Sequence, residues 1–288
     1  MQRNRKIHRE RYSAAPAVVA SLLVVFAIAP NLSALRNRGA PLHDMFSGRA
    51  LEQVSANATI HAGDSAWAAQ VSFRPGEILN YRLGWAVFAN AAAAQLAVVE
   101  KRDFFGMPTW HFRASAHTQG PLRSLAEIDD QFDSYADIGT LESRQYETYL
   151  DELGEKQNTV SRLVSTGSAK KNQTPAVLVK PGTRDPLGAL YFLRTIDWQR
   201  TPEFEAPVYD GEDLYEMRVR VDGPTEVISV AGRAVSTTKI SIHLFRGGRQ
   251  SRTECSIWFS QDDARIPVLI QAEVPYGMVR AELTSQTR

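Results

Sequence analysis

The six histidines are the residues best suited to bind a metal or to move protons. They are His8, His43, His61, His111, His117 and His243. No two of them have the H-x-x-x-H or H-E-x-x-H spacing that places a pair of imidazoles on one helical turn. His111 and His117 share one face of an expected strand, but ~20 Å of extended chain separates them. The histidines therefore predict no metal site unless neighbouring strands supply further ligands.

A group of aspartates could supply paired carboxylates for acid–base chemistry, or a calcium site. The group comprises Asp129, Asp130, Asp133 and Asp137. Strand alternation puts Asp129 and Asp133 on one face and Asp130 on the other, which favours a solvated strand face. The sequence has no G-x-S-x-G, P-loop or G-x-G-x-x-G motif, so we expect no catalytic residue and no cofactor.

One segment, Gly182 to Trp198, predicts a helix centred on about 186–196. Asp185 is placed to cap the free N–H groups of the first turn, and Pro186 suits the first helical position. Arg194 falls in the last turn, against the negative end of the helix dipole. Apolar residues cover most of the remaining surface, so this helix is expected to be buried on most sides.

The sequence pattern of the remaining residues from 73 to 285 predicts mainly β-strands. In Leu79 to Val87 every second residue is apolar, which is typical of a strand with one buried face. The first hairpin is expected to turn at Asn90, and glycine-containing turns such as Asp210-Gly211 separate the later strands. We predict one mainly β domain over 73–285, a large antiparallel meander that forms a curved open sheet or barrel. Such a sheet would be lipocalin-like or lipoprotein-carrier-like, with the central helix filling its concave side.

The N-terminal residues predict export. Five basic residues precede an apolar run from Ala14 to Ala29, which is typical of a secretory signal peptide or an N-terminal membrane anchor over 1–34. A polar, small-residue stretch over 35–72 is expected to be a flexible tether. We therefore expect a periplasmic protein that contacts a membrane, if at all, through this N-terminal segment. Lys plus Arg number 33 against 32 for Asp plus Glu, so the chain has no basic excess to attract nucleic acid.

Three motifs resemble those of a known family. They are Gly76-Glu77-x-Leu79-x-Tyr81, Asp185-x-Leu187-x-x-Leu190-Tyr191-x-Leu193-Arg194, and Ile257-Trp258-x-Ser260-x-Asp262-x-x-Arg265-x-Pro267-Val268. With these motifs the chain resembles exported bacterial proteins grouped as domain of unknown function 3108, over about Phe73 to Leu283. The resemblance implies an exported β-rich domain and assigns no catalytic or ligand-binding residue. One departure is that Asn90 and four alanines stand in the first hairpin, where a glycine is expected.

A few residues of the expected domain stand out as candidates for a site. Four large apolar side chains are interpreted as either ligand-facing or core: Trp85, Leu187, Tyr191 and Trp258. Arg194 is expected to form a buried structural ion pair with Asp262 or with Glu77, which would fix the helix against the sheet.

The sequence leaves three functions open. The preferred one is a non-enzymatic binding module that holds a lipid or another hydrophobic small molecule on its concave face. The first alternative is a structural or interaction protein of the periplasm that binds an envelope protein through a sheet edge or loop. The second is a hydrolase whose site is assembled across strands. A ligand-sized apolar void would favour the first function, a filled core the second, and a polar cleft joining a histidine to a carboxylate the third.

Overall fold

The computed structural model describes residues 71–287 except 105, 167–175, 252 and 275–276. The predicted signal or anchor at 1–34 and almost all of the predicted tether at 35–72 lie outside these described residues. None of the helices in the described part of the chain is long and apolar enough to cross a membrane.

Strands dominate the described residues. The first seven strands are β1 (Ile78–Trp85), β2 (Phe88–Phe104), β3 (Met107–Thr118), β4 (Asp129–Asp137), β5 (Ser143–Glu152), β6 (Glu155–Ser165) and β7 (Val177–Val179). The later strands are β8 (Glu203–Tyr209), β9 (Leu214–Val221), β10 (Glu226–Val230), β11 (Arg233–Arg246), β12 (Arg249–Gln250), β13 (Glu254–Ser260), β14 (Pro267–Val274) and β15 (Gly277–Thr287). The helices are α2 (Gly120–Leu125) and α3 (Pro186–Leu193).

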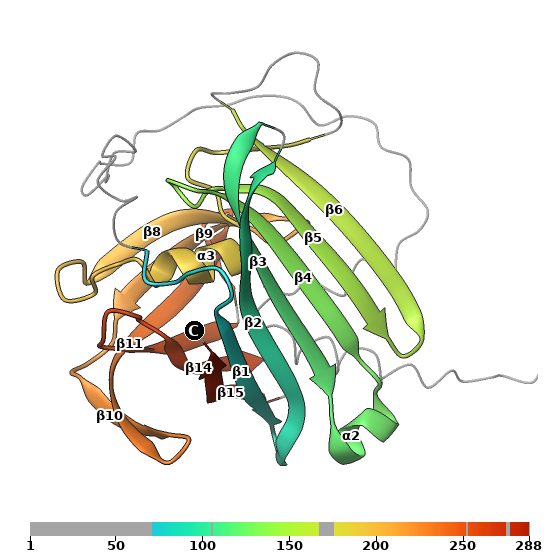
Figure 1. Cartoon of the computed structure of the whole chain (residues 1–288), viewed down its shortest axis with the longest axis vertical. Coiled ribbons are helices and arrows are strands. Elements are labelled where there is room, and N and C mark those ends of the chain that lie inside the picture. The colour runs from blue at the N-terminus through green and yellow to red at the C-terminus, as the bar shows by residue number, and fades with distance from the viewer. Residues whose placement is uncertain (1–70, 105, 167–175, 252, 275–276, 288) are drawn as a thin grey trace, which may run out of the picture.

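All the strands belong to one curved sheet. Its order is β7-β6-β5-β4-β3-β2-β1-β15-β14-β13-β11-β9-β8, and β10 and β12 pair with β11 outside this path. Neighbouring strands are antiparallel except for β6 and β7. Pairing of β1 with β15 joins the two ends of the domain, and Figure 1 shows how the sheet wraps around α3. The predicted antiparallel barrel-like fold with one central helix is confirmed.

A short segment before α3 nearly closes the barrel. Arg184 N donates to the Pro207 oxygen of β8 at 3.2 Å, and Tyr209 N donates back to the Arg184 oxygen at 2.9 Å. One residue earlier, the Thr183 oxygen accepts from Ser143 N of β5 at 3.1 Å. Pro207 can occupy this edge strand because a residue at a sheet edge does not need its N–H for pairing, and its oxygen is still free to accept from Arg184. This segment therefore connects the two sides of the sheet and leads the chain directly into α3.

The inner face of the sheet carries the core. In β3, Trp110 and Phe112 are at most 1% exposed and face inwards, where α3 packs against β3, β4 and β8. The alternate residues of the same strand, which include His111 and Arg113, lie on the outer face. The helix thus occupies the concave side, as the apolar character of its whole surface predicts.

The first hairpin differs from its prediction. The chain turns at Ala86 and Val87, where Trp85 pairs with Phe88, and not at Asn90. Ala86 has a φ of 49°, so the turn uses a left-handed residue without a glycine. Val87 is 88% exposed, although alternation placed it on the buried face. The four alanines that follow Asn90 lie within β2, where their small side chains continue the strand.

The helices also differ from prediction in extent and number. Helix α3 ends at Leu193, three residues before the predicted end, and Arg194 is its C-terminal cap. Asp185 caps its N-terminus and Pro186 occupies the first turn, both as predicted. Helix α2 was not predicted, because its six residues are too few to show a helical period.

Candidate functional site

A buried ion pair holds the C-terminal end of α3. Nη1 and Nη2 of Arg194 donate to the two carboxylate oxygens of Glu77 at 2.5 and 3.1 Å. Nη2 also donates to the main-chain oxygen of Ala264 at 3.1 Å. The two charged side chains are only 1% and 2% exposed. Because the guanidinium and the carboxylate meet through two parallel hydrogen bonds, the pair fixes the orientation of the helix as well as its position.

The prediction that Asp262 pairs with Arg194 is wrong, and the alternative partner Glu77 is the one observed. Asp262 Oδ1 instead accepts from Ser260 Oγ at 2.6 Å, within its own turn. The same Ser260 Oγ accepts from Ile266 N at 2.8 Å, which closes the turn. The turn therefore contacts Arg194 through the main-chain oxygen of Ala264, while the Asp262 carboxylate accepts a hydrogen bond within the turn.

The N-terminal end of α3 is held by a second buried carboxylate. Asp185 is fully buried and accepts from Gly188 N at 2.8 Å. Its Oδ2 also accepts from Ser134 Oγ of β4 and from Ser143 Oγ of β5, both at 2.5 Å. Burial raises the pKa of the Asp185 carboxyl against the opposing effect of these hydrogen bonds. The capping residue therefore also fastens the helix to the sheet.

The four apolar candidates are packed side chains. Trp85, Leu187, Tyr191 and Trp258 are 8%, 1%, 1% and 7% exposed. Tyr191 stacks on Phe112 of β3 with ring centroids 3.9 Å apart and planes 8° apart. Trp85, Leu187 and Tyr191 are thus part of the packed core inside the barrel, whereas Trp258 lies on the outer face, where its Nε1 donates to Glu226 of β10.

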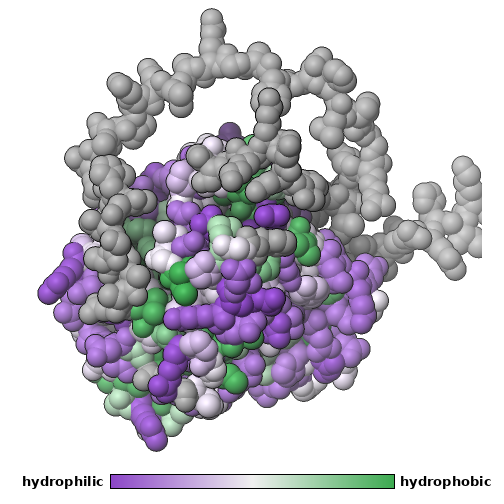
Figure 2. All heavy atoms as spheres, turned by 45° about the horizontal axis from the view of Figure 1, so that its top comes forward, coloured by the Kyte–Doolittle hydropathy of each residue, from purple (hydrophilic) through white to green (hydrophobic). Residues whose placement is uncertain are grey.

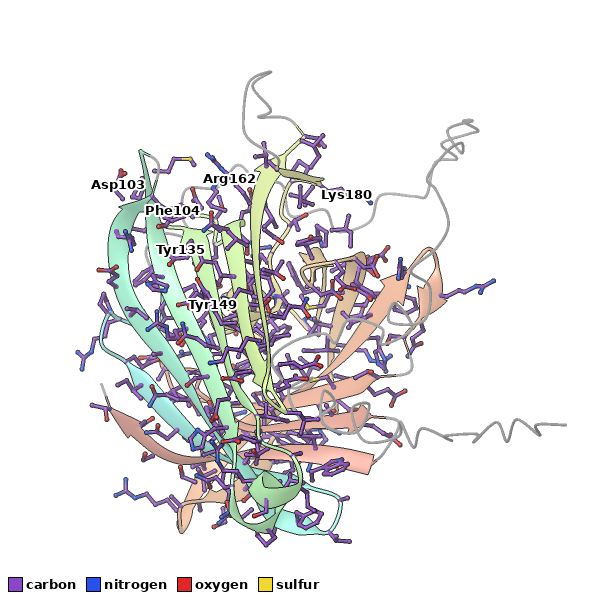
Figure 3. The ribbon with its side chains drawn as sticks, turned by 90° about the vertical axis from the view of Figure 1, so that its right-hand side faces the viewer. Asp103, Phe104, Tyr135, Tyr149, Arg162 and Lys180 are labelled. Carbon is purple, nitrogen blue, oxygen red and sulfur yellow. The ribbon has the colours of Figure 1, made fainter. Side chains whose placement is uncertain are left out.

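A polar cluster on the outer face of β3 and β4 joins a histidine to a carboxylate. His111 Nε2 lies 2.5 Å from Asp133 Oδ1, and Arg113 Nε donates to the same oxygen at 2.8 Å. Tyr135 stacks on the His111 ring with a centroid distance of 4.5 Å, and Phe104 stacks on Tyr135 at 4.5 Å. Figure 3 shows Phe104 and Tyr135 on this side of the sheet. Asp133 is 1% exposed, so the prediction of a solvated aspartate face is wrong for this residue.

The chemistry available to His111 is limited by its surroundings. Its ring contacts Asp133 and Tyr135, and its Nδ1 lies 4.0 Å from Glu100 Oε1. None of these groups is the serine or cysteine nucleophile that a histidine–aspartate pair activates in hydrolases. The hydrogen bonds from His111 and Arg113 hold the pKa of the Asp133 carboxyl below its usual range, although its burial acts in the opposite direction. We interpret the pair as a structural contact between two strands.

The two other histidines among the described residues, His117 and His243, do not join this cluster. His117 is exposed and lies 3.2 Å from the side-chain amide of Gln119. His243 Nδ1 is 3.0 Å from the side-chain amide of Gln250 in β12. In the part of the chain that the structure describes, no three His, Cys, Asp or Glu side chains are grouped so that they could hold a metal ion.

Asp130 is a second aspartate for which the solvated interpretation is wrong. It lies on the inner face of β4 and is 3% exposed, and Asp151 N donates to its Oδ1 at 3.0 Å. Burial raises its pKa to about 7, and burial also raises the pKa of nearby Glu152. Two carboxyl groups with raised pKa values thus lie together, the buried Asp130 and the partly buried Glu152.

The pH dependence of stability should report on Asp130. Its pKa rises from ~3.9 in the unfolded chain to about 7 in the folded chain. The folded state therefore binds more protons between these values, and the stability that Asp130 contributes is lost as the pH rises through this range. We expect Asp130→Asn to flatten the pH dependence of the free energy of unfolding, and to be more stable than the wild type at pH 8. Urea denaturation from pH 5 to pH 8 measures this, and an unchanged slope would rule out Asp130 as its source.

A groove of about 540 Å³ runs along the outside of the barrel. It lies between the tip of the β10–β11 hairpin and the outer face of β14, β15 and β1. Its lining includes Ile228, Val230, Leu269, Leu283, Arg82, Arg280 and Glu282. The sequence alone does not reveal this groove, because its walls come from opposite ends of the domain. A second groove of about 430 Å³ lies beside β8 and β9, near Lys180 and Phe245.

The β10–β11 hairpin forms one wall of the larger groove. Ile228 and Val230 are partly buried and pack against the core, whereas Val227, which precedes Ile228 on the same strand, is 66% exposed. The hairpin is tied down by Trp258, whose Nε1 donates to Glu226 Oε2 at 2.9 Å. Trp258 thus lies on the outer face of the sheet and supports the groove from below.

The chain matches one known protein family over most of its length. The model of a protein family of unknown function, DUF3108, matches residues 80–284. The chain belongs to this family. No curated protein matches it.

Solved structures show some likeness to this DUF3108 chain. One is a β-barrel-like protein of domain of unknown function DUF1849 from Brucella abortus, with 11% identity and a TM-score of 0.47, covering 73% of this chain and 96% of that one. Another is the hypothetical protein CT021 from Chlamydia trachomatis, with 8% identity and a TM-score of 0.33, covering 76% of this chain and 89% of that one.

The DUF3108 range covers both the anchored helix and the outer groove. All of α3 and the walls of the groove lie within it, while Glu77 lies just before its first residue. Four of the motif residues hold the helix: Asp185 and the Arg194–Glu77 pair anchor its two ends, and Tyr191 stacks on the sheet. These motif residues therefore serve to position α3 inside the barrel.

Proposed function

We propose that this DUF3108 chain is an exported, non-enzymatic binding protein for a lipid or another hydrophobic small molecule, and that the outer groove holds the ligand. Export is inferred from the basic and apolar N-terminal sequence. The observation that carries the binding proposal is the groove of about 540 Å³ between the β10–β11 hairpin and the outer wall. Its volume falls within the range of ~300–1,000 Å³ that is usual for small-molecule sites.

The apolar part of the groove supports a hydrophobic ligand, while the rest of its lining is polar or charged. One wall presents the partly buried Ile228 and Val230. Leu269 also lines the groove but is only 4% exposed, so most of the apolar surface open to a ligand comes from the hairpin. By contrast, the face of the molecule in Figure 2 is largely hydrophilic, with scattered hydrophobic side chains where the chain is not drawn grey. Adjacent apolar side chains in a concavity offer a ligand more favourable burial than isolated ones on a surface.

The packed side chains around α3 support the alternative of an interaction protein of the periplasm, since Leu187 and Tyr191 are each only 1% exposed. The two functions differ in one measurable respect. Only the binding protein needs a saturable small-molecule site at the β10–β11 hairpin.

The neutral fluorescent probe N-phenylnaphthylamine tests the binding proposal. We expect saturable one-to-one binding to the full chain, purified after export, with an increase in fluorescence on entry into the groove. Thr284→Trp should weaken this binding by at least about tenfold, because Thr284 is exposed, lines the groove and would place an indole in it. Ser236→Trp is the control, since Ser236 is an exposed residue of the same hairpin that does not line the groove.

Two results would contradict the proposal. Absence of saturable probe binding would leave the interaction protein as the better-supported function. Equal loss of binding in both variants, or no loss in either, would place the probe somewhere other than this groove.

A further inference from the structure

The open side of the groove carries three charged side chains in contact. Arg82 Nη2 of β1 donates to Glu282 Oε2 at 2.5 Å, and Arg280 Nε donates to Glu282 Oε1 at 2.6 Å. Their side chains are 54%, 45% and 33% exposed for Arg82, Arg280 and Glu282. Two guanidinium groups therefore share one carboxylate, and the cluster has a net charge of plus one.

Strand register places this cluster at one end of an amphipathic row. Trp258 lies opposite Leu269, Leu269 lies opposite Glu282, and Glu282 lies opposite Arg82 on successive strands. Residues directly opposite each other across antiparallel strands share a face of the sheet. The outer face thus changes from apolar to charged over four strands, and the hairpin covers the apolar end.

The two arginines keep donors for a further anion. A guanidinium has five N–H donors, and each of these arginines uses one of them in its hydrogen bond to Glu282. Hydrogen bonding to Arg82 and Arg280 lowers the pKa of the Glu282 carboxyl, so Glu282 is ionised at neutral pH and holds both guanidiniums in place. Arginine binds carboxylates and phosphates through pairs of such donors.

We infer that the groove takes a single-chain amphiphile with an anionic head group, a carboxylate or a phosphate. The chain lies along the hairpin residues Ile228 and Val230, which line the groove. The head group lies on Arg82 and Arg280. This inference rests on the proposed binding function and adds the charge and the orientation of the ligand.

Displacement of N-phenylnaphthylamine from the full chain by four amphiphiles with the same twelve-carbon chain tests the inference. The four are dodecanoate, dodecyl phosphate, dodecanol and dodecyltrimethylammonium, each used below its micelle concentration. We expect the two anionic compounds to displace the probe at concentrations at least about tenfold lower than dodecanol, and the cationic compound to be the weakest. The advantage of the anions should shrink as salt is added, because the arginines are exposed.

Charge reversal locates the head group. We expect Arg280→Glu to abolish the preference for anions while dodecanol still displaces the probe. Arg218→Glu is the matched control, because Arg218 Nε makes the same contact with Glu216, two residues away on β9, at 2.8 Å and lies outside the groove. Retention of the preference in Arg280→Glu, or its loss in Arg218→Glu, would overturn the assignment of the head group to this cluster.

The outcomes separate this inference from the function on which it rests. Equal displacement by dodecanol and by the anions would overturn the anionic head group and leave the hydrophobic site standing. Displacement by inorganic phosphate at the concentrations that suffice for dodecyl phosphate would show an anion site without a chain site, and would overturn the amphiphile. A chain that never binds the probe would overturn both proposals.

Discussion

Replacing Arg194 with alanine should lower the free energy of unfolding by roughly 3–5 kcal/mol. The substitution leaves the Glu77 carboxylate, 2% exposed, without the guanidinium that satisfies both of its oxygens. A buried charge without a partner is far costlier than a lost surface contact, because water cannot replace the missing donor. Urea denaturation followed by tryptophan fluorescence measures the change.

Two further variants show whether the loss comes from the unpaired charge. The double variant Glu77→Gln with Arg194→Met should recover much of the stability, because it removes both charges and keeps side chains of similar size. Arg200→Ala is the surface control: Arg200 is 88% exposed, pairs with Asp197 at 3.5 Å, and should cost no more than about 1 kcal/mol. If Arg194→Ala were as mild as Arg200→Ala, the ion pair would not be what anchors the helix.

Replacing Tyr191 with alanine should also lower the free energy of unfolding by roughly 3–5 kcal/mol. Its ring is 1% exposed, stacks on Phe112 at 3.9 Å and meets Phe73 edge-on at 5.1 Å. Removing it leaves a cavity between α3 and the sheet, which surrounding side chains held in strands can fill only in part. The same denaturation experiment measures it.

Tyr191→Phe is the matched variant for this prediction. The Tyr191 hydroxyl is buried and has no hydrogen-bond partner among the described residues. A buried hydroxyl without a partner is unfavourable, so we expect Tyr191→Phe to leave the stability unchanged or to raise it. A loss of more than about 1 kcal/mol in this variant would mean that the hydroxyl does make a hydrogen bond.

The anchoring of α3 has a consequence for function. Both ends of the helix are tied to the rest of the domain by buried side chains, Asp185 at one end and Arg194 at the other, and its surface is packed against the inner face. A ligand could enter the concave side only by displacing these contacts. The outer groove requires no such displacement, since it is bounded by a hairpin that lies on the wall of the barrel.

Local sequence patterns were sufficient to predict α3 and most of the strands, although not the short helix α2. The capping aspartate and the first-turn proline predicted where α3 begins, since a helix start depends on residues within one turn of each other. Period-two alternation predicted the strands, and the apolar surface of the helix predicted its burial. The first hairpin was misplaced because a left-handed Ala86 carries no sequence signal of the kind that a glycine gives.

The tertiary structure alone decided which distant residues meet. Glu77 reaches Arg194 across 117 positions of sequence, and Arg82 reaches Glu282 across 200. The pairing of β1 with β15 sets the second contact, and a shift of one residue in that register would turn Arg82 to the other face. Alternation fixes which residues share a face within one strand, but it carries no information about which strand lies beside it. The helix and the strands were therefore readable from the sequence, whereas the ion pair that anchors the helix and the groove proposed to bind the ligand depend on long-range packing.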